Sequence, residues 1–214
     1  MDRPDLEPSV AKGKILDEAT EFAGAKRSHW IFGYGSLMWN PGFPYLERRL
    51  GVLQGYRRTY AMFSTRLRGS TDRPGLVLSV VPGGTCTGVA FRVAQEHWDD
   101  TLTKLDKREG TGRAHLRVWV PVRWVGNGDS CANPALTYLP LQSYPNYIPG
   151  LPLERQAELV ARGLGSTGSS LEYLELLMKE LRALGIQEPE LEALHQASLK
   201  CRRELSHDRG GLLG

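Results

Sequence analysis

The sequence predicts an α+β fold, in which a small mixed β-barrel carries one inserted helix and has C-terminal helices packed on it. Two observations predict this class. Strand-like segments run from about residue 29 to residue 139, interrupted by one helical segment, and only helical patterns follow from residue 152. Strands followed by helices are typical of α+β domains, whereas regular strand–helix alternation would indicate a parallel α/β sheet.

The predicted strands of the first half lie at residues 29–32, 51–63, 76–81 and 85–93. They are rich in the aromatic and β-branched residues that favour strands. The first runs into Gly33-Tyr34-Gly35, and a tyrosine between two glycines indicates a tight turn. Pro82-Gly83-Gly84 separates the last two strands and predicts a hairpin between them.

The period changes over residues 94–108, where Trp98, Leu102 and Leu105 recur at helical spacing. This segment is the predicted inserted helix. Residues 116–125 then alternate apolar with polar or bulky residues, which predicts a long half-buried strand, and residues 135–139 predict a last strand.

Three C-terminal helices are predicted at residues 153–162, 171–184 and 190–205. The middle one has a clear start, because Ser169 stands three residues before Glu172 in the pattern of a capping box. It has a clear stop at Gly185, since glycine commonly ends helices.

The composition suits one globular domain with an appendage. The chain has 214 residues, of which 41% are hydrophobic and 24% charged. Residues 1–27 predict an N-terminal extension with a short helical stretch at 15–22, and residues 28–207 predict the domain. The polar, acidic start and the absence of long apolar runs predict a cytoplasmic protein without a membrane partner. Cys86, Cys131 and Cys201 are widely spaced, which favours reduced structural thiols.

Two patterns in the sequence do not indicate a cofactor or metal site. Residues 163–168 match the G-x-G-x-x-G pattern of dinucleotide sites, but they follow a helix rather than a strand, so we interpret them as a connection between helices. The five histidines show no metal-ligand spacing, and we predict neither a metal nor a cofactor.

Seven arginines stand between Glu47 and Arg73 against two acidic residues. Such a surplus could meet an anionic small molecule or a phosphate backbone. We favour a surface whose arginines have partners within the molecule. No aromatic residues interleave in the manner of single-strand binding, and we predict no nucleic-acid partner.

Two features carry chemistry. In Phe32-Gly33-Tyr34-Gly35-Ser36-Leu37, glycines let the backbone approach a ligand closely, and successive N–H groups can bind an anion. On residue types alone an ordinary turn remains the alternative. Glu109 ends the inserted helix within a run of four charges, which is more often a solvated helix end. A carboxylate directed into the barrel mouth would instead suit acid/base work.

The two features and their surroundings resemble the ChaC family of γ-glutamylcyclotransferases, which act on glutathione. The resemblance covers about Trp30 to Leu194. Its pieces, in shared order, are Tyr34–Pro41, Gly55–Arg58, Arg73–Leu78, Gly88–Val93, Leu105-Asp106-x-Arg108-Glu109, Leu153-x-x-Gln156-Ala157 and Leu184–Ile186.

The resemblance implies a γ-glutamylcyclotransferase-like barrel and cleavage of glutathione to 5-oxoproline and Cys-Gly. In that reaction the substrate's α-amine attacks its own γ-carbonyl, and Glu109 is the implied general acid/base. The implied substrate-binding residues are Ile31, Phe32, Gly33, Tyr34, Gly35, Ser36, Leu37 and Tyr147. We expect a monomer or homodimer acting on a small molecule.

The chain departs from the family pattern beside Glu109. Arg113 and Ala114 replace small flexible residues, and His115 stands where a tyrosine is expected. His115 could titrate near the site, although a structural role is commoner. Two alternatives to glutathione cleavage therefore stay open: cyclotransfer on another γ-glutamyl amine or dipeptide, and a catalytically silent γ-glutamyl-binding homologue.

Overall fold

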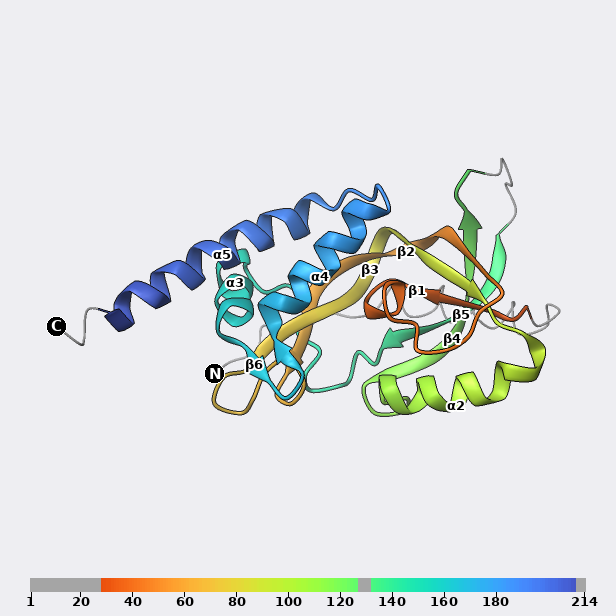
Figure 1. Cartoon of the computed structure of the whole chain (residues 1–214), viewed down its shortest axis with the longest axis horizontal. Helices are drawn as coiled ribbons and strands as arrows, with labels where there is room; N and C mark the ends of the chain where they lie inside the picture. Colours follow the sequence, from red (N-terminus) through yellow and green to blue (C-terminus); the bar gives the residue numbers. More distant parts are fainter. Residues whose placement is uncertain (1–27, 127–131, 211–214) are drawn as a thin grey trace.

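Five strands form a closed barrel in the computed structural model, which describes residues 28–126 and 132–210. The strands are β1 (Trp30–Gly33), β2 (Glu47–Ser64), β3 (Gly75–Arg92), β4 (His115–Trp124) and β5 (Asn133–Pro140), in the spatial order β1-β3-β2-β4-β5. The pair β1–β5 is parallel and the others are antiparallel. The predicted mixed barrel is confirmed (Figure 1).

The hairpin predicted at residues 82–84 is wrong. β3 runs through them and pairs with β2 over the full length of both strands, and the reversal of the chain lies at residues 65–74. Opposite Pro82 to Thr85 the register shifts at Gly55, and Gly55, Gly83 and Gly84 all have positive φ. Glycine takes such φ values without strain, so both strands bend here while the ladder continues.

The helices confirm the predicted order. α2 (Trp98–Glu109) follows the short η3 (Gln95–His97) and lies between β3 and β4 in the chain. α3 (Leu153–Arg162), α4 (Ser170–Ala183) and α5 (Pro189–Gly210) come last. The capping box of Ser169 and Glu172 is present, and Gly185 follows α4 with φ +68°. Residues 163–168 form part of a small hairpin, β6 (Leu164–Gly165) with β7 (Gly168–Ser169), between α3 and α4.

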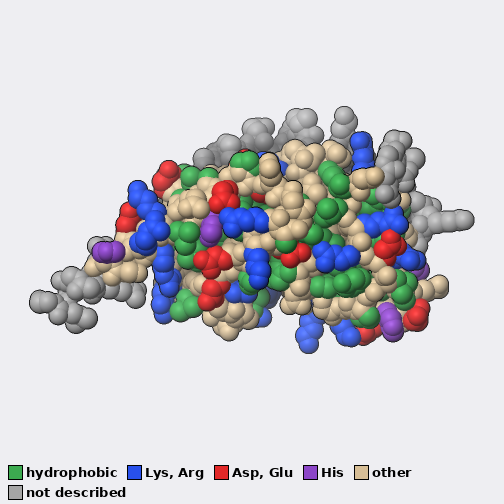
Figure 2. Space-filling model, turned by 45° about the horizontal axis from the view of Figure 1, so that its top comes forward, with side chains coloured by type: hydrophobic (Ala, Val, Ile, Leu, Met, Phe, Trp, Pro, Cys, Tyr) green, Lys and Arg blue, Asp and Glu red, His purple; other side chains and the backbone are tan. Residues whose placement is uncertain are grey.

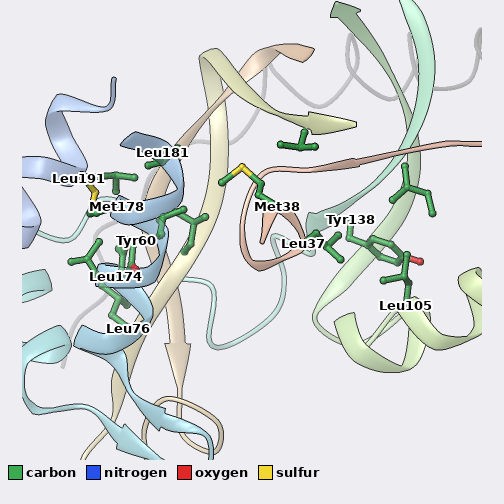
Figure 3. Packing of buried hydrophobic residues seen from close by; sticks show 14 of the residues in the cluster. Leu37, Met38, Tyr60, Leu76, Leu105, Tyr138, Leu174, Met178, Leu181 and Leu191 are labelled. Atoms are coloured by element: carbon green, nitrogen blue, oxygen red, sulfur yellow. The ribbon is translucent and has the colours of Figure 1, made fainter. Parts of the chain in front are cut away.

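The hydrophobic residues form two cores. One fills the barrel and is built from Phe32, Leu53, Val80, Cys86, Ala90, Val120, Val122, Trp124, Ala135 and Leu139. The other joins the barrel wall to α2, α3, α4 and α5. Figure 3 shows two groups of residues in the second core, one around α4 that includes Leu174 and one toward α2 formed by Leu37, Tyr138 and Leu105. Met38 lies between the two groups. Residues 37 and 38 thus connect both groups of helices to the barrel.

Five of the seven arginines between Glu47 and Arg73 have a charged or aromatic partner among the described residues, which agrees with the interpretation favoured from the sequence. Ion pairs join Arg48 to Glu180, Arg49 to Glu47, Arg57 to Glu190 and Arg58 to Glu188. Arg68 lies over the ring of Tyr173 at 5.5 Å. Figure 2 shows Lys and Arg side chains gathered instead toward the end of the molecule from which α5 projects.

Some sequence predictions fall outside the described residues, namely the extension at 1–27 with its helical stretch and the state of Cys131. Cys86 and Cys201 are free thiols. In the part of the chain that is described, no helix combines the length and apolar character that crossing a membrane requires.

Candidate active site

The chain leaves β1 and forms a compact turn at residues 34–38, which ends in the short helix η2 (Ser36–Met38). The N–H of Met38 donates to the carbonyl of Gly35, and that of Asn40 to the carbonyl of Ser36, both at 2.9 Å. The turn folds back on the strand so closely that a Cβ at Gly33 would lie 2.6 Å from the Cβ of Leu37. Glycine at position 33 is therefore what permits this turn.

Backbone donors of the turn remain available. Among the described residues, the N–H groups of Gly35 and Leu37 have no hydrogen-bond acceptor. The N–H of Ser36 is taken, because it donates to the phenol oxygen of Tyr173. Two free, neighbouring N–H groups in a tight turn can receive a carboxylate or a developing oxyanion.

The residues before the turn lie in the protein interior. The side chains of Ile31 and Phe32 are fully buried, and the carbonyl of Phe32 accepts a hydrogen bond from Thr137 at 2.8 Å. Phe32 belongs to the core inside the barrel and Ile31 to the core between the barrel wall and the helices, so the strand that leads into the turn is anchored on both faces. Tyr34 donates its hydroxyl to the carbonyl of Tyr138 at 2.7 Å.

Glu109 is the last residue of α2, which ends because Gly110 takes the left-handed conformation. Its side chain is 21% exposed, so the carboxylate has lost most of its water. Burial raises the pKa of Glu109, and the neighbouring His115 and Arg108 lower it by less. A carboxyl group with a raised pKa exchanges protons closer to neutral pH, as acid/base catalysis requires.

Glu109 and the turn are close neighbours. The negative charge of Glu109 is, after burial, the next cause that raises the pKa of Tyr34 and of Tyr173. Arg108 bridges the two parts: its guanidinium donates to the Ser36 hydroxyl at 3.0 Å, and its Nε lies 3.4 Å from the Glu109 carboxylate. The structure therefore brings together the two features, which lie more than 70 residues apart in the sequence.

A second connection runs through the tyrosine at the end of β5. The carbonyl of Tyr138 accepts a hydrogen bond from the Tyr34 hydroxyl, and the Tyr138 hydroxyl donates to Asp106 at 2.9 Å. Asp106 also pairs with Arg117 at 2.7 Å and, through its carbonyl, accepts the N–H groups of Gly110 and Thr111 that end the helix. These bonds fix the end of α2 relative to the turn.

Tyr173, Arg108 and Arg58 were not among the residues predicted for the site. Tyr173 comes from α4, and its ring packs on Trp39 with centroids 5.8 Å apart. A tyrosine on the buried face of a helix rich in leucine is a weak signal that sequence reasoning could have used, because its hydroxyl must find a partner. For Tyr173 that partner is Ser36 in the turn.

His115 and Tyr147 both bond to backbone carbonyls, but in different parts of the structure. The Nδ1 of His115 donates to the carbonyl of Glu109 at 2.7 Å, which fixes the start of β4 against the end of α2. The hydroxyl of Tyr147 donates to the carbonyl of Val80 at 3.2 Å, and burial raises the pKa of Tyr147 to about 12. Among the described residues, no hydrogen bond or ring contact joins Tyr147 to the turn at residues 34–38, and its role in the site stays a prediction.

A cavity of about 400 Å³ lies elsewhere, between α3, α5 and the loop before β3. Four arginines (73, 155, 162 and 202) line it together with Asp72, Glu158, Ser206 and apolar residues, and none of the predicted site residues does. Within residues 28–126 and 132–210, no three His, Cys, Asp or Glu side chains gather as a metal site would need.

Comparisons with known proteins give one consistent result. A family model described as ChaC-like protein matches residues 29–201. A glutathione-specific γ-glutamylcyclotransferase of Escherichia coli is 35% identical over 165 residues, covering 77% of this chain and 70% of the relative. A glutathione-specific γ-glutamylcyclotransferase 1 of Danio rerio is 31% identical, covering 84% and 93%.

The fold has a close structural counterpart as well. A crystal structure of a γ-glutamylcyclotransferase specific to glutathione from yeast superposes with a TM-score of 0.75. The two share 21% sequence identity, and the match covers 83% of this chain and 99% of the yeast chain. At this identity the likeness establishes the barrel architecture.

Proposed function

The chain belongs to the ChaC-like protein family, and from that premise we propose that it is a γ-glutamylcyclotransferase that cleaves glutathione, with Glu109 as its general acid/base. The observation that carries the proposal is the mostly buried Glu109, whose pKa is raised, placed beside a turn with free N–H donors. Relatives named for this activity and a shared barrel support it.

The reaction is internal to the substrate. The α-amine of the γ-glutamyl group forms a C–N bond to its own γ-carbonyl carbon, and the bond from that carbon to the cysteinyl nitrogen breaks. The products are 5-oxoproline and Cys-Gly, with the same atoms as glutathione. The protein has to hold the folded conformer, move one proton and stabilise the oxyanion.

Glu109 is proposed to move the proton. Its carboxylate takes a proton from the ammonium group, which makes the amine nucleophilic, and returns one to the departing nitrogen. A single carboxylate can do both in turn because the two nitrogens share one carbon in the intermediate. Arg108 holds the carboxylate beside the turn through its contacts to Ser36 and Glu109.

The turn is proposed to bind the γ-glutamyl group. The free N–H groups of Gly35 and Leu37 supply the donors, while Ile31, Phe32 and Gly33 support them from the end of β1. Tyr34, Ser36 and Tyr147 complete the proposed substrate-binding set. The cytoplasmic location and the monomer or homodimer state expected from the sequence stay predictions.

The test is release of 5-oxoproline and Cys-Gly from glutathione, measured by mass spectrometry with Glu109→Gln beside wild type. We expect the variant to lose about 1,000-fold in kcat, since general acid/base groups contribute that much. Glu96→Gln, an exposed glutamate in η3 just before α2, is the control and should match wild type. Wild-type rates in Glu109→Gln would contradict the proposal.

The substrate is tested separately, because Arg113, Ala114 and His115 depart from the family pattern near Glu109. Rates on glutathione, γ-glutamyl-alanine and γ-glutamyl-lysine are compared under one condition. We expect kcat/KM to be highest for glutathione. A higher kcat/KM for another compound would show that this compound, and not glutathione, is the preferred substrate of the same reaction.

A further inference from the structure

Arg58 is a buried charge in the wall of the barrel. It lies on β2, and its side chain is 0% exposed. The guanidinium donates to the carbonyl of Tyr34 at 2.8 Å, to the carbonyl of Thr87 and to the carboxylate of Glu188, and one nitrogen lies 3.5 Å from the sulfur of Met38. A charge this buried persists only when its donors are satisfied.

The contacts of Arg58 span the turn at residues 34–38. Tyr34 is its first residue and Met38 its last, so one planar group touches both ends from the interior side. The third partner, Glu188, precedes α5, and its carbonyl accepts the first N–H groups of that helix, from Leu191 and Glu192. Arg58 thus joins the turn to the start of α5.

The bond to Tyr34 has a consequence for the next residue. Tyr34 C=O and Gly35 N–H belong to one peptide unit, and the described residues contain no cis peptide bond. In a trans peptide the two groups point in opposite directions. With the carbonyl held by Arg58, the Gly35 N–H is aimed away from the interior, and it is one of the donors left free by the described residues.

We propose that Arg58 is a positioning residue for catalysis: by holding the Tyr34 carbonyl from behind, it orients and polarises the Gly35 N–H that receives the substrate. A hydrogen bond from a charged donor to a peptide carbonyl strengthens the N–H at the other end of the unit. Glu188 supplies the compensating charge. The inference rests on the proposed cyclotransferase function and adds a role that Glu109 does not cover.

A comparable arginine–glutamate pair begins at the residue before Arg58. Arg57 forms an ion pair with Glu190 at 2.9 Å, but their side chains are 48% and 72% exposed. Arg57 therefore resembles Arg58 in sequence position and in bonding to the start of α5, without the burial and without contact to the turn. It is the control for any effect of removing an arginine from β2.

The experiment separates positioning from stability. Arg58→Met with Glu188→Gln removes both charges, so no unpaired buried charge remains, and replacing buried pairs by neutral groups often keeps stability. We expect this double variant to keep its Tm within a few degrees and to lose about 100-fold in kcat/KM for 5-oxoproline release, as loss of an oriented oxyanion donor does. Its acid limb in the pH profile should not move, since Glu109 is untouched.

The single variant Glu188→Gln gives the opposite pattern. It keeps the hydrogen bond from Arg58 to Tyr34 but leaves the buried arginine charge without a counter-charge. We therefore expect Tm to fall, while kcat/KM measured below the unfolding transition stays within about 3-fold of wild type. Arg57→Met with Glu190→Gln should change neither quantity.

Two outcomes would overturn the inference. One is a folded Arg58→Met/Glu188→Gln protein with wild-type kcat/KM, and the other is a loss of activity in the Arg57 control equal to that in the Arg58 variant. Failure of the proposed function is distinguishable, because the wild-type protein itself would then release no 5-oxoproline from any γ-glutamyl compound tested.

Discussion

The turn at residues 34–38 and the end of α2 are the two halves of the site, and they are held in opposite ways. The turn is fixed from the interior, by Arg58 behind it, Tyr173 against Ser36 and close contact between Gly33 and Leu37. The end of α2 is fixed mainly from the surface, through Arg108 bonded to the carbonyls of Asn40 and Pro41 and through Asp106 bonded to Arg117.

The difference indicates what each half contributes. Backbone donors act only if they are held rigidly, and rigid positions in proteins come from close packing. A proton shuttle needs a raised pKa and access to two nitrogens, which a partly exposed helix end provides. Substitutions that disturb the close packing beneath the turn should therefore cost stability together with activity. Substitutions that remove only a polar contact, at the end of α2 or at the turn itself, should cost mainly activity.

The largest expected effect on stability lies beneath the turn. A Cβ at Gly88 would meet the carbonyl oxygen of Gly33 at 2.4 Å and the ring of Phe32 at 2.7 Å, and the backbone cannot yield there cheaply. We expect Gly88→Ala to lower the free energy of unfolding by about 3 kcal/mol, as overpacking does, and to reduce activity. Urea unfolding measures the first. A change below about 0.5 kcal/mol, the range of ordinary surface substitutions, would show that the packing of Gly88 against Gly33 and Phe32 is not tight.

The next effect concerns the surface half. Arg108→Met removes the bridge between Ser36 and Glu109, and we expect kcat/KM to fall about 50-fold because misplacement of a reacting group by 1 Å costs about 100-fold. The free energy of unfolding should change by less than about 1 kcal/mol, because the contacts are exposed. If stability fell as far as in Gly88→Ala, the contrast between the halves would be lost.

The pH profile tests the electrostatics of Glu109. Its pKa is raised by burial, so the acid limb of kcat/KM should lie above that of an ordinary glutamate, with activity lost as pH falls and the base becomes protonated. Arg108 lowers this pKa, so Arg108→Met should move the limb to still higher pH. The measurement is kcat/KM against pH for both proteins. A shift toward lower pH would contradict the assignment.

The smallest expected effect links the halves through α4. Tyr173→Phe leaves the ring in place but removes the phenol oxygen that accepts from Ser36. We expect about a 5-fold loss in kcat/KM and little change in Tm, because one neutral hydrogen bond contributes about 1 kcal/mol. Tyr144→Phe, which alters a tyrosine outside these contacts, is the control. Equal losses in both variants would argue against a specific role for Tyr173.

Much of the architecture was predictable because it depends on local patterns. The bounds of α3 agree residue for residue with the predicted 153–162, and the Ser169 capping box starts α4 where expected. The 82–84 hairpin failed because a proline–glycine cluster is compatible with either a reversal or a bulge. Only the partner strand decides, and Gly55 on β2 allows the ladder to bend and continue.

Local patterns in the chain predicted the succession of strands and helices apart from the hairpin at residues 82–84, and the resemblance to a family indicated the turn after β1 and Glu109. The folded barrel was needed to show that the two lie together, that burial raises the pKa of Glu109, and that Arg58, Arg108 and Tyr173 hold the parts in place. The physical reason is that a secondary structure element reflects neighbours in the chain. Burial, charge compensation and the direction of a peptide N–H are set by residues that are distant in sequence and meet only when the barrel closes.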